Sequence, residues 1–175
     1  MFGFKKKEFI LLSVVFVLLS SFVIPNRLLK KMKKEIEITF NTKEVKLTSL
    51  ELNIESLTVY EKDQFFKIEK NNQLLGYAYL GKAPSKTDEF DYLILIDKNL
   101  IIKKSKILIY REDYGGEIGS KRWLKQFIGK TTTDKLQYEK DIIAISGATI
   151  SARSMTKAVN SFFKNLLILK ENKIL

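Results

Sequence analysis

The C-terminal part of the chain passes from a short apolar run directly into a long helical pattern. The run Ile142-Ile143-Ala144-Ile145 is followed by Ser146-Gly147-Ala148-Thr149, and from Ser151 to Leu169 apolar side chains recur at spacings of three and four. A strand that turns through Ser146-Gly147 into a helix directs backbone N–H groups and the positive end of the helix dipole at the turn. The pattern predicts a strand–turn–helix unit suited to a phosphate, with the Thr149 hydroxyl beside it and Ser151 as the N-cap.

The middle of the chain predicts two β-hairpins and one short helix. The expected strands are residues 65–69 with 73–80, and residues 90–96 with 100–110. Asn71-Asn72 supplies the first turn and Asp97-Lys98-Asn99 the second. A helix is expected over residues 121–128, with Ser120 as its N-cap and Gly129 at its C-terminal end. Antiparallel strands packed against helices make an α+β domain.

The N-terminus carries the signs of a membrane anchor. An unbroken run of apolar and serine residues from Phe9 to Ile24 follows Lys5-Lys6-Lys7. A span needs roughly 20 residues, which an extension to Leu29 would supply. A cleaved signal peptide has the same layout, but no small-x-small cleavage site is visible. We therefore expect an uncleaved anchor over residues 1–31, a juxtamembrane connecting segment over 32–60 and one folded domain over 61–175.

The charge is concentrated near this predicted anchor. The net charge is +11, and eight of the 31 basic residues precede position 35, which suits anionic lipid headgroups as a partner. No nucleic-acid-binding module is recognisable, so no nucleic acid is expected. Lysine and arginine counts on the two flanks alone favour a cytoplasmic C-terminal domain.

The chain contains no cysteine and no histidine. This composition excludes disulfides, thiolate nucleophiles, Ser-His triads and His-ligated haem, and no catalytic or metal-binding residue is predicted. Redox chemistry would have to come from a bound organic cofactor.

A second glycine-containing segment precedes the predicted short helix. Gly115-Gly116 and Glu117 follow the last expected strand, and two glycines permit a tight loop whose backbone approaches a ligand. A plain turn explains the two glycines equally well. Trp123 and Phe127 fit a packed core better than a ligand contact.

The motif Ser146-Gly147-Ala148-Thr149 resembles the one that characterises the FMN-binding domain family. Glu112-x-x-Gly115 and the helix ending Gln126-Phe127-x-Gly129-Lys130 occur in the order typical of that family. Its well-known members belong to the Na+-translocating NADH:quinone reductase and to the Rnf electron-transport complex. The resemblance implies FMN joined to Thr149 by a phosphoester bond, donated from FAD by a separate flavin transferase. The other residues that it places at the cofactor are Ser146, Gly147, Ala148, Ser151, Gly115, Gly116 and Glu117.

The resemblance also implies a function and a location. We expect a single-pass protein of the bacterial cytoplasmic membrane with an extracytoplasmic domain, contrary to the charge count. It would relay electrons between other redox subunits or quinone-linked proteins, without being a stand-alone catalyst. One departure stands out, because the family generally has an aspartate where this chain has Ile143, and the nearest aspartate is Asp141. A non-flavinylated binding or assembly subunit of a redox complex is therefore the alternative.

Overall fold

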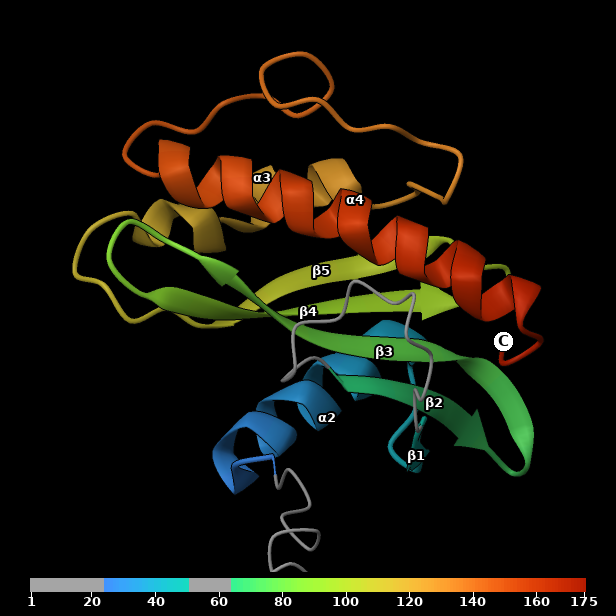
Figure 1. Cartoon of the computed structure of the whole chain (residues 1–175). Helices are drawn as coiled ribbons and strands as arrows, with labels where there is room; N and C mark the ends of the chain where they lie inside the picture. The colour runs from blue at the N-terminus through green and yellow to red at the C-terminus, as the bar shows by residue number, and fades with distance from the viewer. Residues whose placement is uncertain (1–23, 51–63) are drawn as a thin grey trace, which may run out of the picture.

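The computed structural model describes residues 24–50 and 64–175. These residues form an α+β fold, in which a five-stranded antiparallel sheet has the strand order β1-β2-β3-β4-β5 (Figure 1). The strands are β1 (Lys46–Ser49), β2 (Gln64–Lys70), β3 (Gln73–Pro84), β4 (Glu89–Asp97) and β5 (Ile102–Ile109). The helices are α2 (Asn26–Phe40), η1 (Gly116–Gly119), α3 (Lys121–Leu124), η2 (Lys125–Phe127) and α4 (Thr149–Glu171). The predicted α+β class is confirmed.

Both predicted hairpins are present. Between β2 and β3, Asn71 and Asn72 have φ values of 50° and 62°, the left-handed conformation that a two-residue hairpin turn requires and that asparagine tolerates. Between β4 and β5, the Asp97 carboxylate accepts hydrogen bonds from the backbone N–H groups of Asn99 (2.9 Å) and Ile101 (3.1 Å). That turn is longer than expected, so β5 begins at Ile102.

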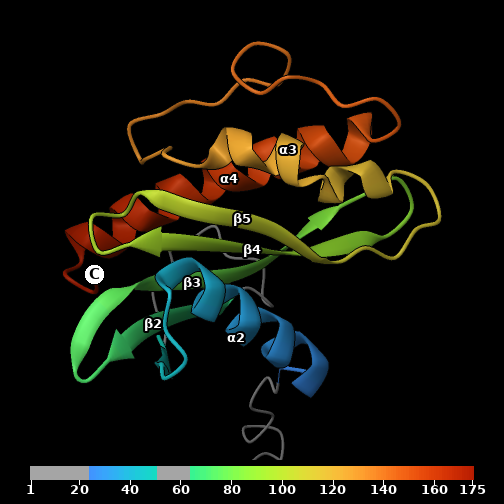
Figure 2. The same ribbon diagram turned by 180° about the vertical axis from the view of Figure 1, so that it is seen from behind.

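Helices cover the two faces of the sheet, with α4 on one and α2 on the other (Figures 1 and 2). Under α4, the Phe162 ring lies 4.8 Å from the ring centre of Tyr79 and 6.1 Å from that of Phe65. Because both faces are covered, neighbouring β4 residues are buried whichever way they point. Leu93 and Leu95 join the core under α2, whereas Ile94 and Ile96 join the core under α4.

The helix α2 crosses the boundary that the sequence predicts at residue 31. Leu28, Met32 and Ile36, four residues apart, are all buried against the sheet. An extension of the span to Leu29 would place Leu28 in the bilayer, yet this side chain packs under the sheet. This stripe lies among lysines and glutamates, so the pattern of the segment alone does not reveal a helix.

Residues 1–23 of the predicted membrane anchor lie outside the described residues. Within 24–50 and 64–175, each helix is too short or too polar to cross a bilayer. The segment 32–60, expected to connect the anchor to the domain, contributes most of α2 and the edge strand β1.

The predicted helix over 121–128 is present as two short pieces. α3 ends at Leu124 and the tighter turn η2 continues to Phe127, after which Gly129 adopts a φ of 83°. Ser120 occupies the N-cap position without a side-chain capping hydrogen bond. Trp123 and Phe127 are buried and meet edge to face at 5.3 Å, so their predicted place in the core is confirmed.

Candidate functional site

The motif lies where the chain enters α4. Thr149 is exposed and is the first residue of the helix, while the buried Ala148 occupies the N-cap position and provides no side-chain cap. The prediction that Ser151 is the N-cap is wrong, because the helix begins two residues earlier. Ser151 is only 2% exposed, and its hydroxyl lies 3.0 Å from the hydroxyl of Tyr110. The side chain of Ser151 therefore fixes the start of α4 against the end of β5.

The strand expected over residues 142–145 is also wrong. Ile142 forms a single parallel bridge with Tyr138, and the residues that follow it are irregular. The backbone of Ile143 pairs instead with side chains. Its carbonyl accepts a hydrogen bond from the Trp123 indole (2.7 Å), and its N–H donates to the side-chain oxygen of Gln126 (2.7 Å). Two side chains of the α3–η2 segment thus position the approach to the motif.

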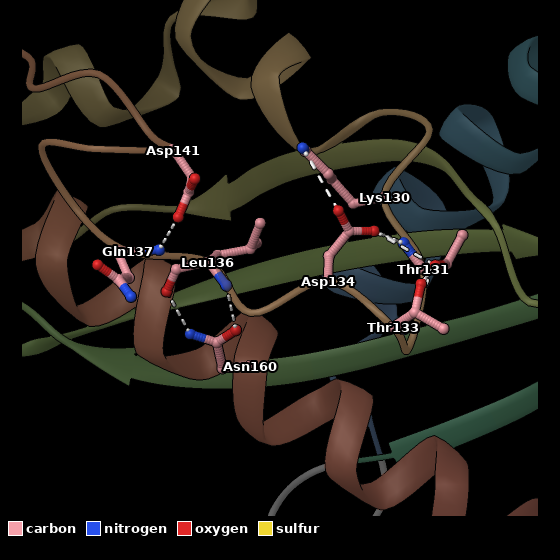
Figure 3. A network of polar contacts seen from close by, with 8 residues as sticks. All are labelled: Lys130, Thr131, Thr133, Asp134, Leu136, Gln137, Asp141 and Asn160. Carbon is pink, nitrogen blue, oxygen red and sulfur yellow. Dashed lines mark hydrogen bonds and ion pairs between the residues drawn. The ribbon is translucent and has the colours of Figure 1, made fainter.

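A long loop carries the motif, and α4 itself holds this loop in place (Figure 3). The Asn160 side chain accepts from the Leu136 N–H (3.0 Å) and donates to the Leu136 carbonyl (2.8 Å). Asp141, the aspartate nearest to the motif, accepts a hydrogen bond from the Gln137 N–H (2.8 Å) and so closes a local turn. Its carboxylate already has a structural role two residues before Ile143.

A pocket of about 260 Å³ opens beside Thr149. It lies between the end of β5, the loop that follows it and the start of α4. Its lining residues are Lys86, Tyr110, Glu112, Tyr114, Gly115, Gly147, Ala148, Thr149, Ile150 and Ser151. The structure thus brings five of the predicted site residues together from two distant segments, and it leaves Ser146, Gly116 and Glu117 outside the lining.

Two of the predicted glycines have left-handed backbones and close neighbours. At Gly115 (φ 84°) a Cβ atom would lie 2.5 Å from the Tyr110 hydroxyl. At Gly147 (φ 81°) a Cβ atom would lie 3.1 Å from a carboxylate oxygen of Glu117. Both positions favour glycine for conformation and for space. Glu117 therefore lies behind the motif, whereas Gly116 has open space around it.

Glu112 holds the turn over residues 85–88, which joins β3 to β4 and contributes Lys86 to the pocket beside Thr149. Its carboxylate accepts hydrogen bonds from the Ser85 hydroxyl (2.6 Å), the Thr87 N–H (2.6 Å) and the Asp88 N–H (3.0 Å). These donors, with that of Ser85 the strongest, lower the pKa of Glu112 from its ordinary 4.5 to about 2. The carboxylate is ionised at neutral pH and fixes the turn that carries Lys86.

Five lining residues are absent from the sequence-based set: Lys86, Tyr110, Glu112, Tyr114 and Ile150. Tyr114 is 85% exposed, and an aromatic ring on the surface at a pocket rim is a feature of binding sites. Only Glu112 carried a sequence signal, through the Glu-x-x-Gly stretch. Lys86 lies sixty residues before the motif, and only the fold brings the two together.

A known family model covers the part of the chain that contains this site. Residues 85–164 match the family model described as the FMN-binding domain. The match begins in the turn held by Glu112, ends within α4 and includes every residue that lines the pocket. No curated protein matches the chain.

Proposed function

We propose that the protein carries FMN covalently on Thr149 and relays electrons in a membrane redox chain, because residues 85–164 match the model of the FMN-binding domain family. The position of Thr149 is the observation that supports this most directly. Its side chain is exposed, lines a pocket and stands at the uncapped start of a 23-residue helix. The helix dipole at this end stabilises negative charge, which suits a phosphate ester.

The attachment would be a transfer from FAD catalysed by a separate flavin transferase. The Thr149 oxygen attacks the phosphorus on the FMN side of the diphosphate. The bond from that phosphorus to the bridging oxygen breaks, AMP leaves, and the transferase accepts the threonine proton. No oxidation or reduction accompanies this step.

The residues around the pocket fit an attached phosphate and ribityl chain. Gly147 and Gly115 have no side chains to fill the pocket beside Thr149, and Lys86 offers a cation from the turn that Glu112 fixes. At about 260 Å³ the pocket is slightly below the range of about 300–1,000 Å³ typical of sites that enclose a ligand. FMN supplies one- and two-electron redox chemistry when bound, and incomplete enclosure would leave it accessible to redox partners.

The proposed location follows from the N-terminal sequence and the family. The apolar run of residues 9–24 and the lysines before it support a single-pass anchor in the bacterial cytoplasmic membrane. With an extracytoplasmic domain, the partners would be membrane lipid, other redox subunits and quinone-linked proteins. A covalent link would prevent loss of FMN outside the cytoplasm.

Co-expression with a flavin transferase tests the proposal. A denaturing gel should show a fluorescent band, and intact mass should show a gain of one FMN residue. Thr149→Ala should lose both signals, whereas Thr133→Ala, which removes another exposed threonine, should keep them. A dark wild-type band without a mass gain would contradict covalent attachment.

Ile143 favours a second candidate, a non-flavinylated binding or assembly subunit of a redox complex. Its side chain is 71% exposed at the position where the family generally has an aspartate, so a transferase approaching the motif meets an apolar surface. Ile143→Asp discriminates between the candidates. Flavin loading that rises from zero in this variant would mean that the natural chain has lost the attachment signal, and equal loading would mean that Ile143 is no obstacle.

A further inference from the structure

A second and larger concavity lies on the far side of β5 from β4. It is a groove of about 600 Å³ between the end of α2, the edge strand β5 and the α3–η2 segment. Figure 2 shows α3 on one side of β5 and α2 on the other. The residues that line it are Lys34, Glu35, Ile38, Thr39, Lys103, Lys104, Ser105, Lys106, Lys121, Leu124, Lys125 and Ile128. Six lysines against one glutamate give this lining, named here the basic groove, a formal charge of +5.

The lysines of the basic groove differ in what they contact. Glu35 on α2 forms ion pairs with Lys104 (2.6 Å) and Lys106 (3.9 Å) on β5. These pairs fasten α2 to the strand and occupy the only carboxylate in the lining. The other four are exposed and make no ion pair within residues 24–50 and 64–175: Lys34, Lys103, Lys121 and Lys125. Four uncompensated cations around one depression attract a polyanion.

Two large apolar side chains also line the basic groove. Ile38 is 59% exposed and Ile128 is 45% exposed, and they come from opposite walls, α2 and the residue after η2. An apolar pair within a positively charged rim favours an occupant that offers both carboxylates and apolar side chains.

We propose that the basic groove docks an acidic, partly apolar segment of a protein partner. A bilayer surface cannot follow a concavity between a helix and a strand edge, whereas a peptide segment can. The α2 residues of the groove, Lys34 to Thr39, lie about 12–20 Å along the helix from the first described residues, at 1.5 Å per residue. The groove is thus remote from the end of the domain to which the predicted anchor attaches. The proposal does not require flavin, so it extends beyond the proposed function.

Charge reversal on the rim tests the proposal in the full chain, purified in non-ionic detergent. The probe is a fluorescent synthetic peptide of glutamate and leucine, and a version with glutamine in place of glutamate is the uncharged control. The groove variant is Lys103→Glu/Lys121→Glu/Lys125→Glu. The matched variant is Lys140→Glu/Lys157→Glu/Lys164→Glu, in which the same change of net charge falls on exposed residues outside the groove.

The groove variant should bind the acidic peptide about tenfold more weakly or worse at moderate salt, and the matched variant should stay within about threefold of wild type. Acetylation footprinting should show that the peptide protects Lys103 and Lys125. An equal loss in both variants, or no binding above that of the glutamine peptide, would overturn the proposal. So would protection of these lysines by phosphatidylglycerol in nanodiscs but not by the peptide, which would assign the groove to lipid headgroups.

Discussion

The two faces of the sheet differ in chemistry and in role. The face under α4 has an aromatic core that includes Phe65, Tyr79 and Phe162, and the helix that covers it begins at the candidate site. The face under α2 has a mainly aliphatic core, and α2 contributes no residue to the pocket beside Thr149. The family match includes β4, β5 and most of α4, but not α2. The α4 face therefore positions the site, whereas the α2 face supports the sheet and leads to the N-terminus.

The largest expected effect lies on the α4 face. Phe162→Ala removes a fully buried ring that contacts three other rings, and it should lower the free energy of unfolding by about 3–5 kcal/mol. Urea unfolding followed by the fluorescence of Trp123, the single tryptophan, measures this. A loss below about 1 kcal/mol, well under that range, would show that α4 is not packed as described, and would remove the support for the position of Thr149.

A smaller effect is expected on the α2 face. Met32→Ala removes a fully buried side chain, and it should cost about 2–3 kcal/mol, the lower part of the range for such truncations. The native emission of Trp123 should stay unchanged, because this residue lies under α4. No loss of stability would mean that α2 is only a linker, and a shifted native emission would mean that the two faces are coupled.

The contrast between the faces also explains which elements the sequence could predict. Both hairpins depend on local turn chemistry at Asn71-Asn72 and Asp97, and α4 depends on a long periodic pattern, so all three are predictable. The buried stripe of α2 consists of only three side chains, and β1 is an edge strand of only four residues. Their positions depend on contacts with distant strands, which a local pattern does not contain.

The third prediction concerns the turn that faces Thr149, on the site side of the molecule. Because the folded-state pKa of Glu112 is about 2 and its ordinary value is 4.5, its ionised form stabilises the fold fully above about pH 4.5. That stabilisation is lost as the pH falls from about 4.5 to about 2. Wild type should therefore melt at a higher temperature than Glu112→Gln at pH 6, and the difference should vanish near pH 2.

Asp113→Asn provides the control for this pH series, because Asp113 is the exposed neighbour of Glu112. Its melting curve should follow that of wild type at every pH. A difference between wild type and Glu112→Gln that persists at pH 2 would mean that the amide disturbs the turn for reasons unrelated to ionisation.

The candidate site was only partly predictable for a related reason. The motif and Gly115 have a local signature, and the pocket is lined by Gly115 and by every motif residue except Ser146. The helix start was misplaced because Gly147 ends the preceding turn early and Ala148 takes the N-cap position, whereas Ser151 is drawn to Tyr110. Lys86 and Tyr110 join the site through pairing of β4 with β5 and packing under α4. Those are long-range contacts, and a single sequence does not encode them in any short pattern.

The smallest expected effect separates a tyrosine of the site from one outside it. Tyr110→Phe deletes the hydroxyl that meets Ser151 at 3.0 Å, so it should cost about 0.5–1.5 kcal/mol. The hydroxyl of Tyr138 is buried without a hydrogen-bond partner among the described residues, so Tyr138→Phe should be neutral or slightly stabilising. Matched urea unfolding curves measure both changes. If the two variants lose equal stability, the Tyr110–Ser151 contact does not anchor α4 to β5. The aromatic core alone would then hold α4 against the sheet.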